Sequence, residues 1–170
     1  MAGEILYKTN YKSPFGNIVL TSDDKNLVGL KFRGNDKGVL TKEDLEVFKL
    51  TKNWLDRYFN GVKPKISELP LRLQGSIFRL RVLEIISEIP YGGVMTYGKI
   101  AEIISKEQGK EKISPQAVGG AAGHNPVLII IPCHRVIGSN GNLTGYAGGV
   151  DLKIKLLKHE GVNVPSGTGA

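Results

Sequence analysis

The chain has 170 residues, a formal net charge of +7, 41% hydrophobic residues and 23% charged residues, which is a globular composition and excludes wholesale disorder. The length suits one large domain or two small ones, and the positive charge favours an anionic partner such as nucleic acid. A single cysteine excludes an internal disulfide and a multi-cysteine zinc site, and no apolar run approaches the roughly 20 residues of a membrane span, so we expect no metal, no membrane and a reducing, cytoplasmic location.

The first domain, residues 1–74, is predicted to be a small sheet followed by a helix. Short β-rich runs separated by turn-forming residues predict a three-stranded antiparallel sheet within the first 32 residues. Apolar residues at helical spacing then predict a helix from Thr41 to Phe59, which Gly61 and Pro64 end. This part of the chain contains no group of reactive side chains, which indicates a scaffold.

The second domain, residues 75–163, is predicted to be mostly helical and to precede a flexible tail at 164–170. Ser76, Thr96 and Ser114 each stand directly before an apolar helical pattern, where an N-cap residue is expected. Three short helices should therefore start after these residues.

The third of these helices is rich in small residues, from Pro115 at its first position through Ala122. A loop joins it to the helix before, which suggests a winged helix-turn-helix-like motif, but the pattern alone favours a plain helical hairpin and the loop is longer than the usual turn. A last helix is expected from Val150 to Glu160. Together with the N-terminal sheet, these helices predict a mixed α/β (α+β) fold.

The segment Pro132-Cys133-His134-Arg135-Val136 contains the residues most suited to chemistry. The proline interrupts regular strand pairing, and the histidine and arginine place positive charge beside the sulfur, which lowers the pKa of a thiol. Neighbouring residues on an extended strand point to opposite faces, so the cysteine and histidine can couple only across a turn or through a water. A third group must orient the imidazole, and Glu160 is the best candidate. An inert core cysteine is the alternative.

This five-residue segment resembles the active-site signature of the O6-alkylguanine-DNA alkyltransferases, the methylated-DNA–protein cysteine methyltransferases. The first 70 residues resemble that family only in general character, but the similarity continues over residues 75–161 and includes Asn125-Pro126, Gly145-Tyr146 and Leu156-Leu157-Lys158-His159-Glu160. The resemblance implies a DNA-repair methyltransferase that flips a damaged guanine out of the duplex and moves its O6-alkyl group irreversibly to Cys133, with O4 of thymine as a second source. It implies no cofactor, and a monomer whose partner is double-stranded DNA containing O6-alkylguanine.

The resemblance also implies roles for single residues. His134 would deprotonate Cys133 through a water while Glu160 holds the imidazole. Asn125 would brace the turn, and Tyr97 would give a proton to the departing base. The substrate pocket would be formed by Tyr146, Val136, Ser139 and Gly119. The third helix would enter the minor groove, and contacts to DNA would come from Gln116, Ala117, Ala121, Arg135 and Thr96.

The sequence departs from this family at three places. Gln116 stands where the family usually has the arginine that fills the gap left by the flipped base, and Ala122-Gly123-His124 stands where a second basic residue is common. We therefore expect weaker DNA binding with a shallower salt dependence than in a typical member. No His or Cys precedes His124, so the zinc ligands of some members have no counterpart.

Two other functions fit the same residues. A protein that binds alkylated DNA without transfer would need no acceptor, so the presence of Cys133 opposes this alternative. A thiol hydrolase could use the cysteine, the histidine and an acid, but it would turn over repeatedly, whereas alkyl transfer to sulfur stops after one equivalent.

Overall fold

The computed structural model describes residues 5–32, 39–109, 113–143 and 145–164. The chain divides into two compact units, Met1–Leu73 with Pro126–Leu128, and Gln74–Asn125 with Ile129–Ala170. The tail predicted at 164–170 lies, apart from Val164, outside the described residues. None of the described helices combines the length and the hydrophobicity that a bilayer crossing requires.

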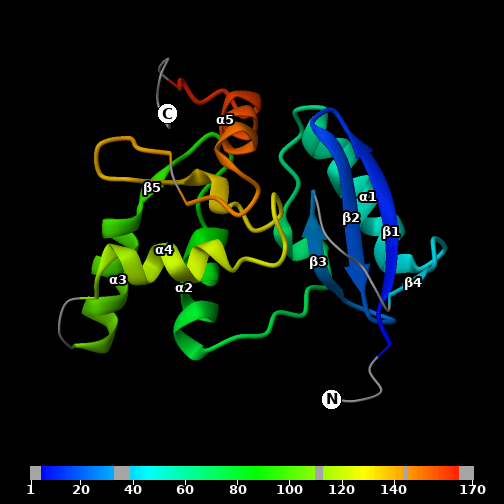
Figure 1. The fold of residues 1–170 in the computed structure, drawn as a ribbon, viewed down its shortest axis with the longest axis horizontal. Helices are drawn as coiled ribbons and strands as arrows, with labels where there is room; N and C mark the ends of the chain where they lie inside the picture. Colours follow the sequence, from blue (N-terminus) through cyan, green and yellow to red (C-terminus); the bar gives the residue numbers. More distant parts are fainter. Residues whose placement is uncertain (1–4, 33–38, 110–112, 144, 165–170) are drawn as a thin grey trace. The chain divides into compact units, whose positions relative to one another are not determined.

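The first unit is built on a sheet of four strands in the order β3-β2-β1-β4 (Figure 1). The strands are β1 (Tyr7–Ser13), β2 (Gly16–Ser22), β3 (Leu27–Lys31) and β4 (Leu40–Thr41). The first three are antiparallel, as predicted, whereas β4 pairs with β1 in parallel and was missed. Leu40 N donates to Leu6 O and Lys42 N donates to Lys8 O, and this pairing holds Thr41 in a strand rather than in the predicted helix.

The helix of this unit, α1 (Glu46–Phe59), therefore begins five residues later than predicted. It contacts β1, β2 and β3, and its side chains Phe48 and Leu55 are fully buried, as are Leu20 and Leu30 of the sheet. A connector with one 3₁₀ turn, η1 (Ile66–Glu68), follows the helix. This core contains the apolar stripe that the sequence predicted.

The segment Pro126–Leu128 completes the first unit although it lies far along the chain. Leu30 N donates to Pro126 O at 2.9 Å and Leu128 N donates to Leu30 O at 3.1 Å, so the segment pairs in parallel with β3. Val127 is fully buried there. The sequence analysis did not predict this return of the chain to the first core.

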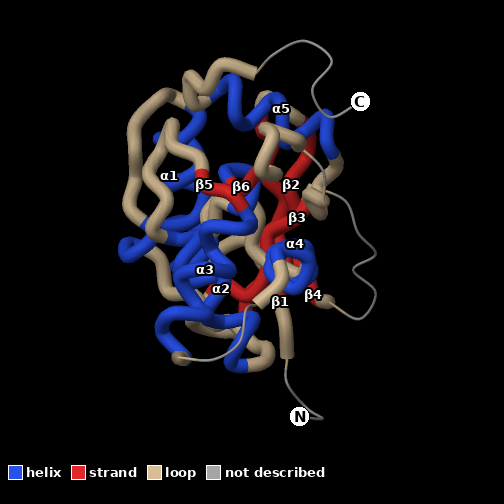
Figure 2. The backbone as a smooth tube through the Cα atoms, turned by 90° about the vertical axis from the view of Figure 1, so that its left-hand side faces the viewer, coloured by secondary structure: helices blue, strands red, loops and turns tan. Residues whose placement is uncertain are grey.

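The second unit is mostly helical (Figure 2). Its helices are α2 (Ile77–Ser87), α3 (Tyr97–Gln108), α4 (Pro115–Gly123) and α5 (Val150–His159), with a short parallel pair β5 (Met95–Thr96) and β6 (Val136–Ile137). The three predicted N-caps form: the hydroxyls of Ser76, Thr96 and Ser114 each accept a bond from the backbone N–H three residues on. The helix pair predicted from the sequence corresponds to α3 and α4. Because α4 packs against both α2 and α3, this pair shares a core with α2.

Candidate active site

The only cysteine lies on a tight turn. A 3₁₀ helix, η2 (Cys133–Arg135), follows Pro132 and leads directly into β6. Arg135 N donates to Pro132 O at 2.9 Å, which closes the turn. Cys133 and His134 are therefore neighbours on a turn and not on an extended strand. Just upstream, Ile129 has φ +69°, a left-handed conformation that is costly for a β-branched residue.

Asn125 braces this turn from the end of α4, as the resemblance implied. Its Nδ2 donates to Ile131 O at 2.9 Å, and its side chain also hydrogen-bonds the sulfur of Cys133. Asn125 is itself 6% exposed, so both contacts are protected from solvent. The amide group thus ties the backbone before Pro132 to the thiol after it.

The thiol of Cys133 is buried, with 4% of the residue exposed. Burial raises its pKa to about 12, although the hydrogen bond from Asn125 and the positive charge of Lys153 act in the opposite direction. The prediction that His134 and Arg135 would lower this pKa is wrong, because Arg135 is paired with a carboxylate and the imidazole is not charged, as shown below. Deprotonation of the thiol therefore needs a base.

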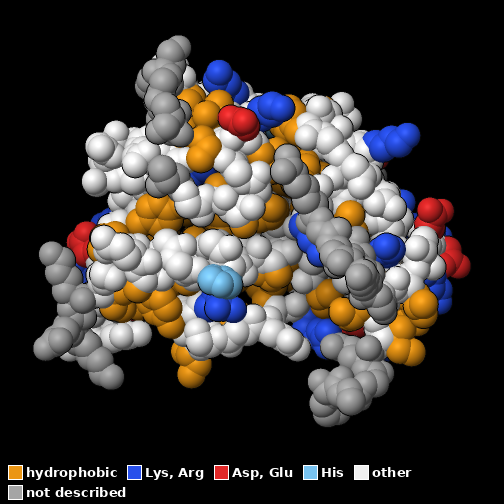
Figure 3. Space-filling view, in the orientation of Figure 1, with side chains coloured by type: hydrophobic (Ala, Val, Ile, Leu, Met, Phe, Trp, Pro, Cys, Tyr) orange, Lys and Arg blue, Asp and Glu red, His pale blue; other side chains and the backbone are white. Residues whose placement is uncertain are grey.

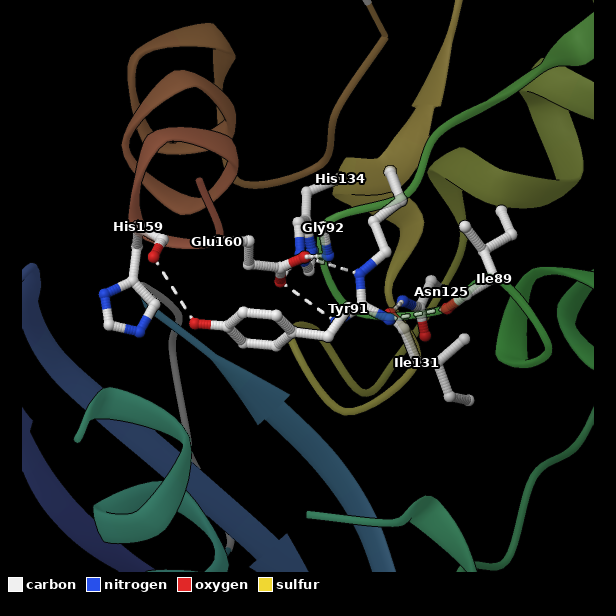
Figure 4. A network of polar contacts seen from close by, with 9 residues as sticks. Ile89, Tyr91, Gly92, Asn125, Ile131, His134, His159 and Glu160 are labelled. Carbon is white, nitrogen blue, oxygen red and sulfur yellow. Dashed lines mark hydrogen bonds and ion pairs between the residues drawn. The ribbon is translucent and has the colours of Figure 1, made fainter. Parts of the chain in front are cut away.

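A buried network surrounds Glu160, the residue that follows α5 (Figure 4). Arg135 Nε donates to Oε1 at 2.7 Å and its Nη2 donates to Oε2 at 3.0 Å. His134 Nε2 lies 2.6 Å from Oε2, and Gly92 N donates to Oε1 at 3.1 Å. Arg135 Nη1 also donates to Ile89 O at 2.6 Å. The structure therefore joins His134 to Glu160 as predicted.

The electrostatics of this network fix the tautomer of His134. Burial alone raises the pKa of the Glu160 carboxyl, but the hydrogen bonds and positive charges of His134 and Arg135 outweigh it and hold that pKa well below its usual range. Burial lowers the pKa of His134 despite the carboxylate, so the imidazole is neutral at neutral pH. Since the carboxylate accepts from Nε2, the proton resides there and Nδ1 keeps its lone pair. Nδ1 is buried and has no hydrogen-bond partner among the described residues. His134 can therefore act as a base by accepting a proton at Nδ1.

Two tyrosines lie within electrostatic reach of the thiol. Burial raises the pKa of Tyr97, the first residue of α3, and the charge of Cys133 adds to the shift. The pKa of Tyr146 is raised by burial and by the charges of Cys133 and Glu160. The rings of Tyr146 and His134 meet edge to face with centroids 6.4 Å apart. Gly119 of α4 faces the ring of Tyr97, since a Cβ there would lie 3.9 Å from two ring carbons.

The other two predicted pocket residues, Val136 and Ser139, follow the turn that carries Cys133. Val136 is buried and follows the turn directly, and its carbonyl accepts from Lys153 Nζ at 2.5 Å. Ser139 is exposed on the turn after β6. No contact of Ser139 with the thiol is found among the described residues, so its part in the pocket stays a prediction.

The predicted DNA-binding residues divide into two groups. Gln116 and Ala117 are exposed on the first turn of α4, and Thr96 is half-buried as the cap of α3. Ala121 is only 7% exposed because it packs inside the unit, and Arg135 is 8% exposed because its guanidinium binds Glu160. The structure therefore does not support the predicted DNA contacts of Ala121 and Arg135. Among the described residues, no group of three His, Cys, Asp or Glu side chains could hold a metal ion.

Sequence reasoning missed Lys153, which is fully buried on α5. The sequence does contain a pattern that indicates this position. Leu156, Leu157 and Glu160 follow Lys153 by three, four and seven positions, so the four residues share one helix face. A lysine on an apolar face that also carries the network's glutamate is a candidate functional group.

Comparison with known proteins shows similarity over both units. The family model described as 6-O-methylguanine DNA methyltransferase, ribonuclease-like domain, matches residues 6–73, and that described as 6-O-methylguanine DNA methyltransferase, DNA binding domain, matches residues 77–162. The methylated-DNA--protein-cysteine methyltransferase of Metallosphaera sedula is 42% identical over 158 residues, which cover 92% of this chain and 95% of the relative. That of Methanosarcina acetivorans is 41% identical over 160 residues, covering 92% and 99%.

Solved structures give the same result. The crystal structure of the Mycobacterium tuberculosis O6-methylguanine methyltransferase matches with a TM-score of 0.82 at 33% identity, covering 95% of this chain and 96% of that one. The structure of the Mycobacterium tuberculosis OGT in complex with DNA matches with a TM-score of 0.81 at 35% identity, covering 91% and 92%. The similarity therefore includes both the N-terminal sheet and the helices around the thiol.

Proposed function

Because the chain belongs to the 6-O-methylguanine DNA methyltransferase family, we propose that it repairs DNA by moving an alkyl group from O6 of guanine to Cys133. The observation that carries the assignment is the neutral imidazole of His134, the residue after the only cysteine: Glu160 holds it, and its Nδ1 has no hydrogen-bond partner among the described residues. O4 of thymine is a second source of the alkyl group. The protein acts where DNA is found, in the cytoplasm and on the nucleoid if the cell is prokaryotic, or in the nucleus if it is eukaryotic.

The residues support the following sequence of steps. The Sγ proton passes through a water to Nδ1 of His134, and the imidazolium that forms is stabilised by Glu160. A sulfur lone pair then forms the S–C bond to the alkyl group as the C–O6 bond breaks, and that electron pair stays on the guanine. The guanine takes up one proton, for which we assign the Tyr97 hydroxyl as donor, and the proton held by His134 then returns through solvent to the Tyr97 phenolate. The product is a thioether, so each protein molecule acts once.

DNA reaches this site through the face formed by α4. The exposed Gln116 and Ala117 are the residues of α4 that we assign to the minor groove, and the small residues of the helix allow close approach of the backbone. The thiol is buried in the protein without DNA, so the alkylated base must be extruded from the duplex to reach it. Tyr146 and Gly119 are the residues that we assign to the pocket for that base.

Incubation with a duplex that contains one O6-methylguanine tests the proposal. We expect one methyl group per protein, on the peptide that contains Cys133, because a thioether is not hydrolysed under these conditions. Mass spectrometry of the digested protein measures this increment, and the same duplex with unmodified guanine is the control. Tight binding without a mass increment would instead indicate a sensor of alkylated DNA, and repeated turnover would indicate a hydrolase; either result contradicts transfer to Cys133.

Replacing Gln116 with arginine is expected to strengthen DNA binding several-fold and to increase the salt dependence by about one counterion. The residue is exposed at the start of α4, where a guanidinium adds both charge and a stacking surface. Titration of a fluorescent duplex at several salt concentrations measures the change. Asn60→Arg on the exposed end of α1 adds the same charge and serves as the control. Equal affinities for the two variants would remove Gln116 from the interface.

A further inference from the structure

Lys153 is a buried cation that the steps above do not use. The residue is fully buried on α5, where an ammonium group is costly unless it has partners. Its Nζ donates to Val136 O at 2.5 Å, at the end of the turn that carries Cys133. Nζ also lies 5.7 Å from the centre of the Tyr97 ring. Lys153 thus contacts both the end of the turn that carries Cys133 and the ring of Tyr97.

The other charges near the sulfur are compensated among themselves. The charge of Arg135 is taken up by Glu160 through two hydrogen bonds, and His134 is neutral and bound to the same carboxylate. Among the described residues, Lys153 supplies the positive charge that lowers the pKa of the Cys133 thiol, and the charge of Cys133 in turn raises the pKa of Lys153, although burial outweighs both effects. Tyr97 and Tyr146, whose pKa values the charge of Cys133 also affects, are neutral because burial raises those pKa values.

We propose that the Lys153 ammonium group is the counter-ion of the Cys133 thiolate, and that the rate of alkyl transfer depends on its charge. Its role is electrostatic: no proton passes through it, the Sγ proton still goes to His134, and the sulfur lone pair still forms the S–C bond. The inference extends the proposed function, because it concerns the same thiol, but it is tested without DNA.

The proposal predicts an unusual pH dependence of thiol reactivity. Burial lowers the pKa of Lys153 to about 8 and raises that of Cys133 to about 12. Below pH 8 the thiolate fraction rises tenfold per pH unit. Above pH 8, the two groups together hold one proton: either Cys133 is a thiolate and Lys153 an ammonium, or Cys133 is a thiol and Lys153 an amine. Because these two forms contain the same number of protons, their ratio no longer changes with pH. The thiolate fraction should therefore stay constant over a pH range whose width equals the coupling between the two charges in pKa units. At higher pH it should rise again. His134 titrates below this range and the two tyrosines above it.

Alkylation of the DNA-free protein by iodoacetamide measures this profile. We expect Lys153→Met to react about tenfold more slowly than the wild type near pH 7, for a coupling of about one pKa unit, and to match it near pH 10, where the wild-type lysine is also neutral. Lys153→Arg keeps the charge and should react faster than Lys153→Met at both pH values. Lys155→Met, an exposed position on the same helix, is the control and should match the wild type.

The outcomes separate a charge effect from a packing effect. A loss of reactivity in Lys153→Met that is the same at every pH would show that the lysine only supports the turn, and would overturn the proposal. If that variant does not fold, the wild-type profile decides alone: a slope that stays constant from pH 6 to pH 10 contradicts the counter-ion role. The iodoacetamide experiment needs no DNA. A result that contradicts the counter-ion role would therefore not contradict methyl transfer, and a protein that transfers no methyl group could still be tested for the counter-ion role.

Discussion

Replacing Cys133 with alanine is expected to abolish methyl transfer completely while leaving DNA binding within about twofold of the wild type. The sulfur is the only group in the proposed steps that can accept the alkyl carbon, since the chain has no second cysteine. The side chain is small and the surfaces assigned to DNA lie elsewhere, on α4. Single-turnover assays with a methylated duplex, together with a binding titration, measure the two properties on one preparation.

The stability of this variant supplies its control. Removing one buried sulfur should lower the free energy of unfolding by only about 1–2 kcal/mol, because the cavity is small. Transfer of the methyl group to another residue of the alanine variant would show that Cys133 is not the acceptor. Loss of the folded state would show that the cysteine is mainly a packing residue.

Replacing Glu160 with glutamine should destabilise the protein by about 3–5 kcal/mol and slow methyl transfer by about 100-fold or more. The change leaves the Arg135 guanidinium buried without its carboxylate and removes the charge that stabilises protonated His134. Urea unfolding and single-turnover kinetics measure the two effects. Glu88→Gln, at an exposed position after α2, is the matched control and should change neither.

The same substitution should alter the stability at acid pH. The pKa of Glu160 is lower in the folded protein than in the unfolded chain, so its contribution is complete above about pH 4.3 and is lost as the pH falls further. The folded pKa of His134 is also lowered, so its contribution falls as the pH drops through about 6.5. We expect Glu160→Gln to flatten the acid limb below pH 4.3. An unchanged limb would mean that the carboxylate is not ionised in the network.

The features that were predicted correctly from the sequence depend on nearby residues. Ser76, Thr96 and Ser114 cap helices because each hydroxyl satisfies a backbone N–H only three positions away. The family and its activity were predicted from a contiguous five-residue segment, and the comparisons confirm both. Glu160 was predicted as the partner of His134 because a catalytic imidazole needs an orienting acid, and the family's pattern agreed; the structure joins the two residues across 26 positions of the chain.

The features that were missed depend on tertiary contacts. Thr41 continues a helical pattern but lies in β4, because backbone bonds to β1 are available there. Arg135 was predicted to contact DNA, yet it faces inward because Glu160 and the carbonyl of Ile89 offer it three hydrogen-bond acceptors. The pKa of Cys133 was predicted to fall and instead rises, since the burial of a thiol is not visible in its sequence neighbours.

The return of the chain to the first core constrains the length of the segment before the thiol. Between Asn125 and Cys133, the chain adds Pro126–Leu128 to the sheet of the first unit and then re-enters the second through the left-handed Ile129. The excursion itself is hydrogen-bonded to β3, and the bond from Asn125 Nδ2 to Ile131 O joins the residues on either side of it. A single inserted or deleted residue would therefore shift the sulfur out of register with its brace, so this stretch should tolerate substitution more readily than any change in length.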